Sequence, residues 1–224
     1  KYKFGYMPNK WGNSNIGTVQ AFGEISGLAV APEAKFWVGQ RRLRVQDVHI
    51  VDHFLMNAGE YQGAGVMDLK VGSTKVGLTV SSGDTFDNKL VAGASANKIN
   101  LDVGGIETNA GGTVRVLATA VNTSGFGSNN GHGISAVHNQ TNFLTAGLTN
   151  SLFLQTSSGL AKITGEFVSL TPAAGAAAST IFGVKSNRVA DSINWQKGAF
   201  GGQAIVGYQT SKADNQSFTT KDTS

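Results

Sequence analysis

Two groups of ionisable side chains between residues 47 and 53 could form a metal-binding or catalytic site. His49, Asp52 and His53 have the spacing H-x-x-D-H, which on a helix would place both imidazoles on one face for a metal ion. The intervening residues are β-branched, however, and the glutamate of a zinc-protease motif is missing. Asp47 and Asp52 could also form the carboxylate pair of a glycosidase, but neither has an identifiable acid/base setting. We therefore expect no metal ion, no cofactor and no enzymatic activity.

The composition disfavours a helical protein. The 224 residues include 30 Gly and 3 Pro, and only 14% are charged, against roughly 25% in ordinary soluble domains. Ser, Thr, Asn and Gly take their place, as in a barrel lumen or a β-solenoid. No apolar run approaches the length of a transmembrane helix, and the absence of Cys excludes disulfides and thiolate metal sites. The net charge of +4 is spread along the chain, so we expect no nucleic-acid partner.

Alternation of apolar and polar residues is the main signal of local structure. In 75–81, Val76, Leu78 and Val80 point to one side of a predicted strand, whereas Lys75 and Thr79 point to the other. Such a strand could face lipid with its apolar side and water with its polar side. It fits a soluble sandwich equally well, in which the apolar side would form the core.

The same alternation in 98–103 and 113–121 predicts two antiparallel strands joined by the tight turn at 109–112. We expect further strands at 1–7, 19–28, 35–41, 133–137, 143–155, 160–170, 181–184, 192–196 and 202–208. Loop-like composition marks 82–97 and 123–131, and 171–180 could be a small helix or a linker. The chain has no fixed-period repeat. The prediction is an all-β protein, an up-and-down antiparallel barrel.

Residues 36–65 carry a more specific pattern. They are interpreted as a strand, a short turn and a long loop that ends at Gly63-Ala64-Gly65. The sequence Phe36-Trp-Val-Gly-Gln-Arg41, followed by Asp47-Val-His-Ile-Val-Asp52 and then by the glycine pair, resembles the third-loop region of the maltoporin family, the sugar-selective outer-membrane porins. Similarity elsewhere is weaker, as in 106–113.

The resemblance implies an antiparallel transmembrane β-barrel in the outer membrane of a Gram-negative bacterium. Family members are homotrimers of barrels of about eighteen strands, each with its own pore, which the third loop narrows from inside. At roughly ten residues per strand, this chain would hold about 10–12 strands. We therefore expect one domain over 1–224 that is incomplete at both ends. Oligosaccharides and outer-membrane lipid are the implied partners.

The resemblance also implies residues of the pore constriction. Asp47 and Asp52 keep the acidic positions of the motif, and Phe54 stands where the family usually has a tyrosine. An expected pore arginine is replaced by Val45, which leaves Arg41 and Arg44 as substitutes. The full expected set is Trp11, Arg41, Arg44, Asp47, Asp52 and Phe54.

A second family arginine is absent, because Gly23 stands in its place. Trp37 and Trp195 are interpreted as packing or interfacial-belt residues and not as sugar platforms. Gly63 and Gly65 are expected to permit a tight backbone path in the loop, because glycine adopts positive φ freely.

Two functions follow from these observations. The first is an outer-membrane porin through which maltose or maltodextrin-like oligosaccharides diffuse. The alternative is a secreted or cell-surface β-rich protein that binds carbohydrate or mediates adhesion, without channel activity.

Overall fold

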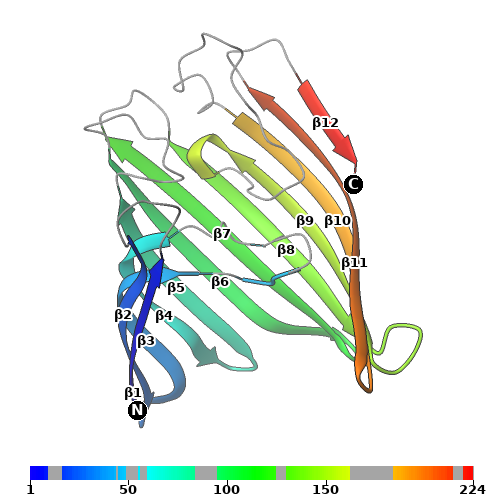
Figure 1. Ribbon diagram of the computed structural model, residues 1–224, viewed down its shortest axis with the longest axis horizontal. Coiled ribbons are helices and arrows are strands. Elements are labelled where there is room, and N and C mark those ends of the chain that lie inside the picture. The colour runs from blue at the N-terminus through cyan, green and yellow to red at the C-terminus, as the bar shows by residue number, and fades with distance from the viewer. Residues whose placement is uncertain are drawn as a thin grey trace.

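The structure is a computed structural model that describes residues 1–9, 17–43, 45–48, 55, 60–83, 95–124, 130–161, 184–213 and 219–223. Within these ranges the chain forms a twelve-stranded antiparallel sheet in which every strand pairs with the next one in sequence (Figure 1). None of the described helices is long and apolar enough to cross a membrane. The prediction of an all-β antiparallel architecture with about 10–12 strands is confirmed.

The strands are β1 (Tyr2–Asn9), β2 (Gly17–Leu28), β3 (Ala31–Arg42), β4 (Glu60–Val71), β5 (Thr74–Gly83), β6 (Ser95–Asn109), β7 (Gly112–Ser124), β8 (Gly131–Thr141), β9 (Leu148–Ser158), β10 (Val184–Lys197), β11 (Phe200–Ala213) and β12 (Thr219–Thr223). A 3₁₀ helix, η3 (Gly159–Ala161), follows β9.

The two ends of the sheet differ in their connections. Turns at 29–30, 72–73, 110–111, 142–147 and 198–199 join consecutive strands at one end, the lower edge of the sheet in Figure 1. The connections at the opposite end are mostly longer, the longest running from 159 to 183. We call these the short-turn end and the long-connection end.

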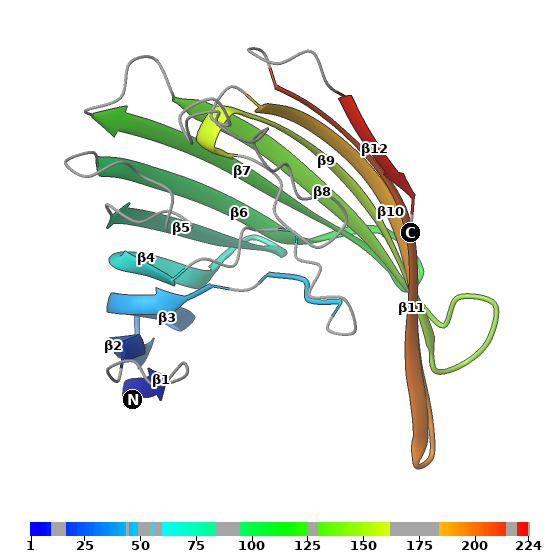
Figure 2. The same cartoon turned by 45° about the horizontal axis from the view of Figure 1, so that its top comes forward.

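The sheet curves into a trough with β1 and β12 at its two edges (Figure 2). The sheet buries polar side chains on one face and exposes apolar side chains on the other, which is the reverse of the distribution in a soluble protein. On β6, the polar Lys98 and Asn100 are 2% and 1% exposed, whereas their neighbours Ile99 and Leu101 are 49% and 43% exposed. The structure thus decides between the two interpretations of the alternating strands, because the apolar side is the exposed side and the polar side faces the hollow. That distribution is the one expected of a lipid-facing wall.

Most predicted strands lie inside observed ones. The segments expected at 1–7, 19–28, 35–41, 75–81, 98–103, 113–121, 133–137, 192–196 and 202–208 are all in strands except for Lys1. The predicted hairpin of β6 and β7 is confirmed, with its turn at Ala110 and Gly111. The segment expected at 143–155 begins too early, because 142–147 form a turn. The elements expected at 160–170, 171–180 and 181–184 lie outside the described residues, apart from the end of η3 and the start of β10.

The expectation that Gly63 and Gly65 lie in a loop is wrong. Both lie in β4, paired with Gly39 and Trp37 of β3, and neither has a positive φ. These glycines allow neighbouring atoms to lie very close to the β4 backbone. A Cβ on Gly63 would lie 2.2 Å from the Val80 carbonyl oxygen, and one on Gly65 would lie 2.8 Å from the Trp37 Nε1 atom. Glycine makes room here for the indole ring and for the neighbouring strand.

Candidate functional site

The chain that follows β3 turns into the hollow of the trough. Leu43 and residues 45–48 lie on the concave side of the sheet (Figure 2). Leu43, Val48 and Leu55 are 7%, 5% and 3% exposed. They belong to one apolar cluster with concave-face side chains of β7–β10, namely Leu117, Val137, Phe153 and Ala190. We call Leu43, residues 45–48 and Leu55 together the inward segment.

The four apolar residues of β7–β10 explain why the inward segment packs against this part of the sheet. Val137 pairs with Phe153, and Phe153 pairs with Ala190, so three of the apolar side chains form a row across β8–β10. The neighbouring concave-face positions on β9 are polar, namely Ser151, Gln155 and Ser157. An apolar row in an otherwise polar wall would be unfavourable in water. The inward segment covers it and thereby leaves Phe153 fully buried.

Hydrogen bonds hold the inward segment to the same wall. The Gln46 and Asn139 side-chain amides bond to each other, with Gln46 Nε2 donating to Asn139 Oδ1 at 2.9 Å and Asn139 Nδ2 donating to Gln46 Oε1 at 3.3 Å. Ser151 Oγ also donates to Asn139 Oδ1, at 2.6 Å. Within the segment, the Leu55 amide donates to the Val45 carbonyl at 2.9 Å. The segment is therefore attached to β8 by side chains and closed on itself by its backbone.

A cationic and aromatic cluster faces the hollow from β2 and β3. Arg41 Nη1 lies 2.7 Å from Glu24 Oε2, and both side chains are largely buried. The same guanidinium lies 4.4 Å from the centre of the Phe22 ring and 5.6 Å from that of Trp37, within the range of cation–π attraction. The ion pair and the ring contacts together hold Arg41 in place on this wall.

Polar side chains that lie opposite one another on neighbouring strands form a row across the concave face of the sheet. Thr79, Asn100 and Thr119 lie on adjacent strands, and the Thr119 hydroxyl donates to Asn100 Oδ1 at 2.7 Å. Further along the row, Ser186 and Ser211 are hydrogen-bonded at 2.9 Å. Most of these groups are uncharged donors and acceptors, which suits a ligand rich in hydroxyls.

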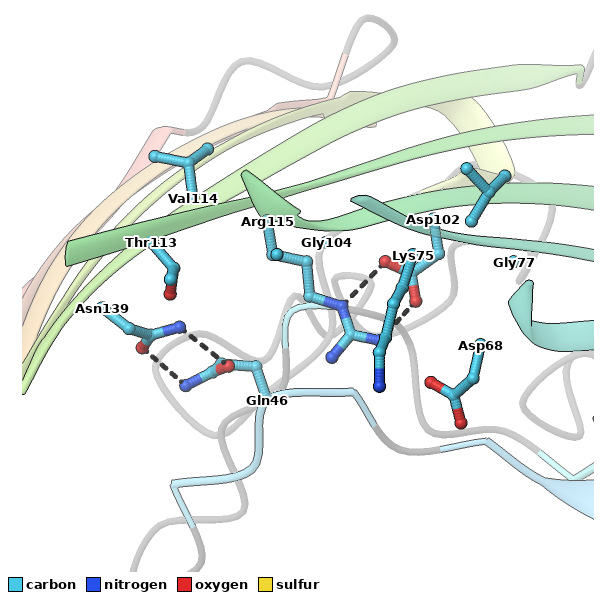
Figure 3. A pocket seen from close by; sticks show the side chains of 12 residues that line it. Gln46, Asp68, Lys75, Gly77, Asp102, Gly104, Thr113, Val114, Arg115 and Asn139 are labelled. Carbon is cyan, nitrogen blue, oxygen red and sulfur yellow. Dashed lines mark hydrogen bonds and ion pairs between the residues drawn. The ribbon is translucent and has the colours of Figure 1, made fainter. Parts of the chain in front are cut away.

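A cavity of about 210 Å³ lies between the inward segment and the walls of β4–β8 (Figure 3). Its charged lining consists of Asp68, Lys75, Asp102 and Arg115, and Gln46 with Asn139 closes one side. Arg115 binds the Asp102 carboxylate through two nitrogens, with Nε 2.7 Å from Oδ1 and Nη2 on Oδ2. We call this space the charged cavity.

The structure describes two of the six expected constriction residues. Arg41 faces the hollow, its charge is engaged by Glu24, and its place in a constriction stays a prediction. Asp47 is an exposed residue of the inward segment, next to Gln46. The remaining four lie outside the described residues: Trp11, Arg44, Asp52 and Phe54. His49 and His53 also lie there, and the described part of the chain contains no group of three metal-ligating side chains.

The structure explains why Val45 and Gly23 stand where the family pattern has arginines. Val45, where a pore arginine was expected, packs against the apolar cluster of the inward segment. Gly23, where a second arginine was expected, pairs with Phe4 and Val38, and the nearest atoms to a Cβ there belong to the Phe4 ring. Both of these partners are strongly exposed on the convex face. A side chain at position 23 would therefore not face the hollow.

The two tryptophans differ in their environment: Trp37 is a packing residue, whereas an interfacial-belt role for Trp195 stays a prediction. Trp37 is 3% exposed and packs over Gly65, whereas Trp195 is 41% exposed near the turn between β10 and β11.

Some cavity residues were missed. Asp102 and Arg115 lie on the polar sides of the predicted hairpin, but their contact is diagonal and depends on the register shift between Val103 and Ile106, which the sequence did not indicate. Gln46 and Asp68 gave no such signal, since both depend on irregular backbone with φ near 56°.

The fold and the site together define a class of protein. An antiparallel meander with an apolar exterior, a polar hollow and a segment folded into that hollow is the wall of a porin. Comparison with known sequences gives the family: the chain matches the LamB porin family over residues 2–224 and belongs to it. This is a family of non-enzymatic channels located in the outer membrane.

Similar sequences include the maltoporins of two strains of Vibrio cholerae serotype O1, El Tor Inaba N16961 and Classical Ogawa 395. Each is 31% identical over 91 residues, a stretch that covers 37% of this chain and 22% of the relative.

Proposed function

We propose that the protein is a sugar-selective porin through which maltose or maltodextrin-like oligosaccharides diffuse across the outer membrane. The inward segment is the observation that carries the proposal. It occupies the hollow of a wall whose outer side is apolar, and it is attached to the far side of that hollow by Gln46 and Asn139. The names of the Vibrio cholerae relatives, maltoporins, support the choice of sugar.

The chemistry of the hollow favours a neutral, hydroxyl-rich solute. The described ion pairs on this face are largely balanced, as in Arg41 with Glu24 and Arg115 with Asp102. Between them lie hydroxyl and amide groups that can both donate and accept hydrogen bonds. A row of moderate contacts lets a solute enter and leave, whereas one tight site would retain it.

The constriction is proposed to be lined by Arg41 and Asp47 together with Trp11, Arg44, Asp52 and Phe54. Asp47 has the strongest support among the described residues, because it is exposed on the segment that enters the hollow. Arg41 would contribute mainly by ordering Phe22 and Trp37, since Glu24 already accepts from its guanidinium.

A homotrimer is proposed as the functional assembly. The convex face of β1 carries the aromatic side chains Tyr2, Phe4 and Tyr6, which are 80%, 87% and 67% exposed. On β5 and β6 the corresponding exposed side chains are aliphatic. The aliphatic part suits lipid chains, and the aromatic part suits contact with another subunit.

Planar-bilayer recording of the full-length protein tests the proposal. Addition of a maltodextrin to one chamber should block the channels reversibly and saturably. Channels that ignore the sugar would reduce the proposal to a general porin. A water-soluble, folded protein without any channel would overturn it in favour of the surface carbohydrate-binding alternative.

A further inference from the structure

One row of side chains on the convex face changes from apolar to basic as it crosses the sheet. Its members lie directly opposite one another on neighbouring strands from β6 to β11. On β6 and β7 they are aliphatic, whereas on β8–β11 they are polar and end in two adjacent lysines. In strand order they are Ile99, Ala120, His132, Ser158, Lys185 and Lys212. We call the last four the basic row.

The basic row lies where the apolar exterior of the sheet ends. Each of its residues is the last or the last but one of its strand at the long-connection end. Four residues further along β9, β10 and β11, the exposed side chains are Leu154, Val189 and Tyr208. Four residues of strand span about 13 Å. The convex face of these strands therefore passes from basic to apolar over a distance comparable to the width of a headgroup layer.

The slant of the strands explains why the row changes character between β7 and β8. Strands of outer-membrane barrels slant by about 35–45°, and neighbouring strands lie about 4.8 Å apart. A row perpendicular to the strands therefore changes depth in the membrane by about 3 Å for each strand that it crosses. In Figure 1, β7–β10 slant from upper left to lower right, so the row rises towards the long-connection end as it passes from β7 to β10. Ile99 and Ala120 are thus at the depth of lipid chains, and the basic row is at the depth of headgroups.

The length of the connections identifies the leaflet that the basic row faces. In outer-membrane barrels the short turns face the periplasm, and the longer connections face the cell exterior. The basic row therefore faces headgroups of the outer leaflet. Its strands lie across the trough from β1, the strand proposed for subunit contact, so this part of the convex face is open to lipid (Figure 2).

The charge of the basic row favours an oxyanion. Lys185 and Lys212 lie directly opposite each other on β10 and β11, and like charges in this position repel. The strands β8–β11 contain one carboxylate, Asp191, which is six residues from Lys185 along β10 and accepts from Asn150 Nδ2 at 2.6 Å. A phosphate group between the two ammonium groups would replace their repulsion with charge-assisted hydrogen bonds.

A second pair of lysines shows how this arrangement binds an oxyanion. Lys70 and Lys75 also lie directly opposite each other, on β4 and β5 at the short-turn end. The Glu33 carboxylate bridges them, with Oε1 3.4 Å from Lys70 Nζ and Oε2 3.4 Å from Lys75 Nζ. Two opposed lysines thus hold one oxyanion through two of its oxygens. Lys185 and Lys212 offer the same arrangement on a face that a lipid headgroup can reach.

Polar groups beside the lysines add donors and acceptors for a sugar headgroup. The Ser158 hydroxyl lies 3.2 Å from His132 Nδ1, so the two strands next to β10 present a hydroxyl and an imidazole together. Thr156 Oγ1 donates to Asn187 Oδ1 at 2.9 Å, which leaves the Asn187 Nδ2 group as a donor. A headgroup that carries both phosphates and sugar hydroxyls matches this surface better than a phosphate alone.

We propose that the basic row binds the phosphate groups of an anionic glycolipid of the outer leaflet. Lys185 and Lys212 are the principal contacts of the phosphate, and the acyl chains lie over Leu154, Val189 and Tyr208. The proposal goes beyond sugar transport and does not depend on which sugar passes through the pore.

The test measures lipid affinity of the labelled full-length porin in detergent by microscale thermophoresis. The probes are diphosphoryl lipid A, the same lipid A without phosphates, and inorganic phosphate. The variant Lys185→Gln with Lys212→Gln removes both charges at little change in size. It should bind diphosphoryl lipid A about tenfold more weakly than the parent and phosphate-free lipid A equally well. Lys185→Arg with Lys212→Arg keeps the charges and should retain the parent affinity.

The matched control is Lys70→Gln with Lys75→Gln, which removes the opposed lysine pair at the other end of the sheet. It should bind diphosphoryl lipid A as the parent does, and an equal loss there would overturn the proposal. Equal affinity of the parent for the phosphorylated and phosphate-free lipids would also overturn it. Inorganic phosphate that binds as tightly as the lipid would show a site for free anions and exclude the lipid assignment. If the double glutamine variant does not fold, Lys212→Gln alone should lower the affinity about threefold, and an unchanged affinity would contradict the proposal.

Discussion

The wall formed by β2–β4 and the wall formed by β7–β10 face the same hollow but are built differently. On β2–β4, glycines admit large side chains, so that Arg41, Phe22 and Trp37 are stacked and an ion pair to Glu24 orders them. On β7–β10, an apolar row centred on Phe153 receives a segment from the other wall. One wall supplies the segment and the other receives it, so the width of the hollow depends on both.

Among these substitutions, we expect the largest loss of stability in the wall of β7–β10, against which the inward segment packs. Phe153→Ala removes a fully buried ring beneath the inward segment and should cost about 3 kcal/mol of stability, as large-to-small core changes do. The freed segment should also widen the channel. Urea unfolding and single-channel conductance measure the two consequences. Leu154→Ala, on the exposed side of the same strand, is the control, and an equal effect there would remove the distinction between the faces.

The variant Arg41→Met tests the ion pair and ring stacking in the wall of β2–β4. This change leaves the buried Glu24 carboxylate without its cation and should destabilise the protein by about 2 kcal/mol. Because the double variant with Glu24→Gln removes the orphaned charge, it should recover part of the loss. A double-mutant cycle in urea unfolding gives the coupling, and additive effects would show that the two side chains act separately.

Close packing of the same wall is tested by Gly65→Ala. The new methyl group would lie 2.7 Å from the Leu78 carbonyl oxygen and 2.8 Å from Trp37 Nε1, so the indole must move. We expect a loss of about 1–2 kcal/mol and a shift of the Trp37 fluorescence emission. Gly72→Ala, at a turn with open space around it, controls for loss of glycine in general, although its φ of 63° adds some strain. An unchanged emission spectrum would contradict the proposed packing.

The smallest effect is expected where the two walls are tied together. Gln46→Ala breaks the reciprocal amide pair and should cost about 1 kcal/mol, a typical net value for hydrogen bonds of this kind. Open-channel noise should rise because the inward segment loses a fixed contact. Asn139→Ala should have a similar effect, and the double variant should cost little more than either change alone. Strictly additive losses would mean that the amides do not act on one another.

Prediction from sequence succeeded where structure is local and regular. The hairpin of β6 and β7 follows from alternation and from the Asn109–Gly112 turn, and both are observed. It failed at β4, because glycines at 63 and 65 suggested a loop, whereas the residues that require them, Trp37 and Val80, are distant in sequence. It also missed Gln46 and Asp68, whose positions depend on a bulge and on a segment held by contacts with other strands.

By itself, the sequence determined that the protein is an antiparallel meander, that its strands have one apolar and one polar side, and that residues 36–65 resemble a sugar porin. These properties depend on the two-residue period of a strand and on short turns. Only the tertiary structure decided which side faces outward, because alternation is the same in a barrel and in a sandwich. It also decided where the inward segment rests and which charges share the cavity, since both depend on contacts between residues far apart in the chain.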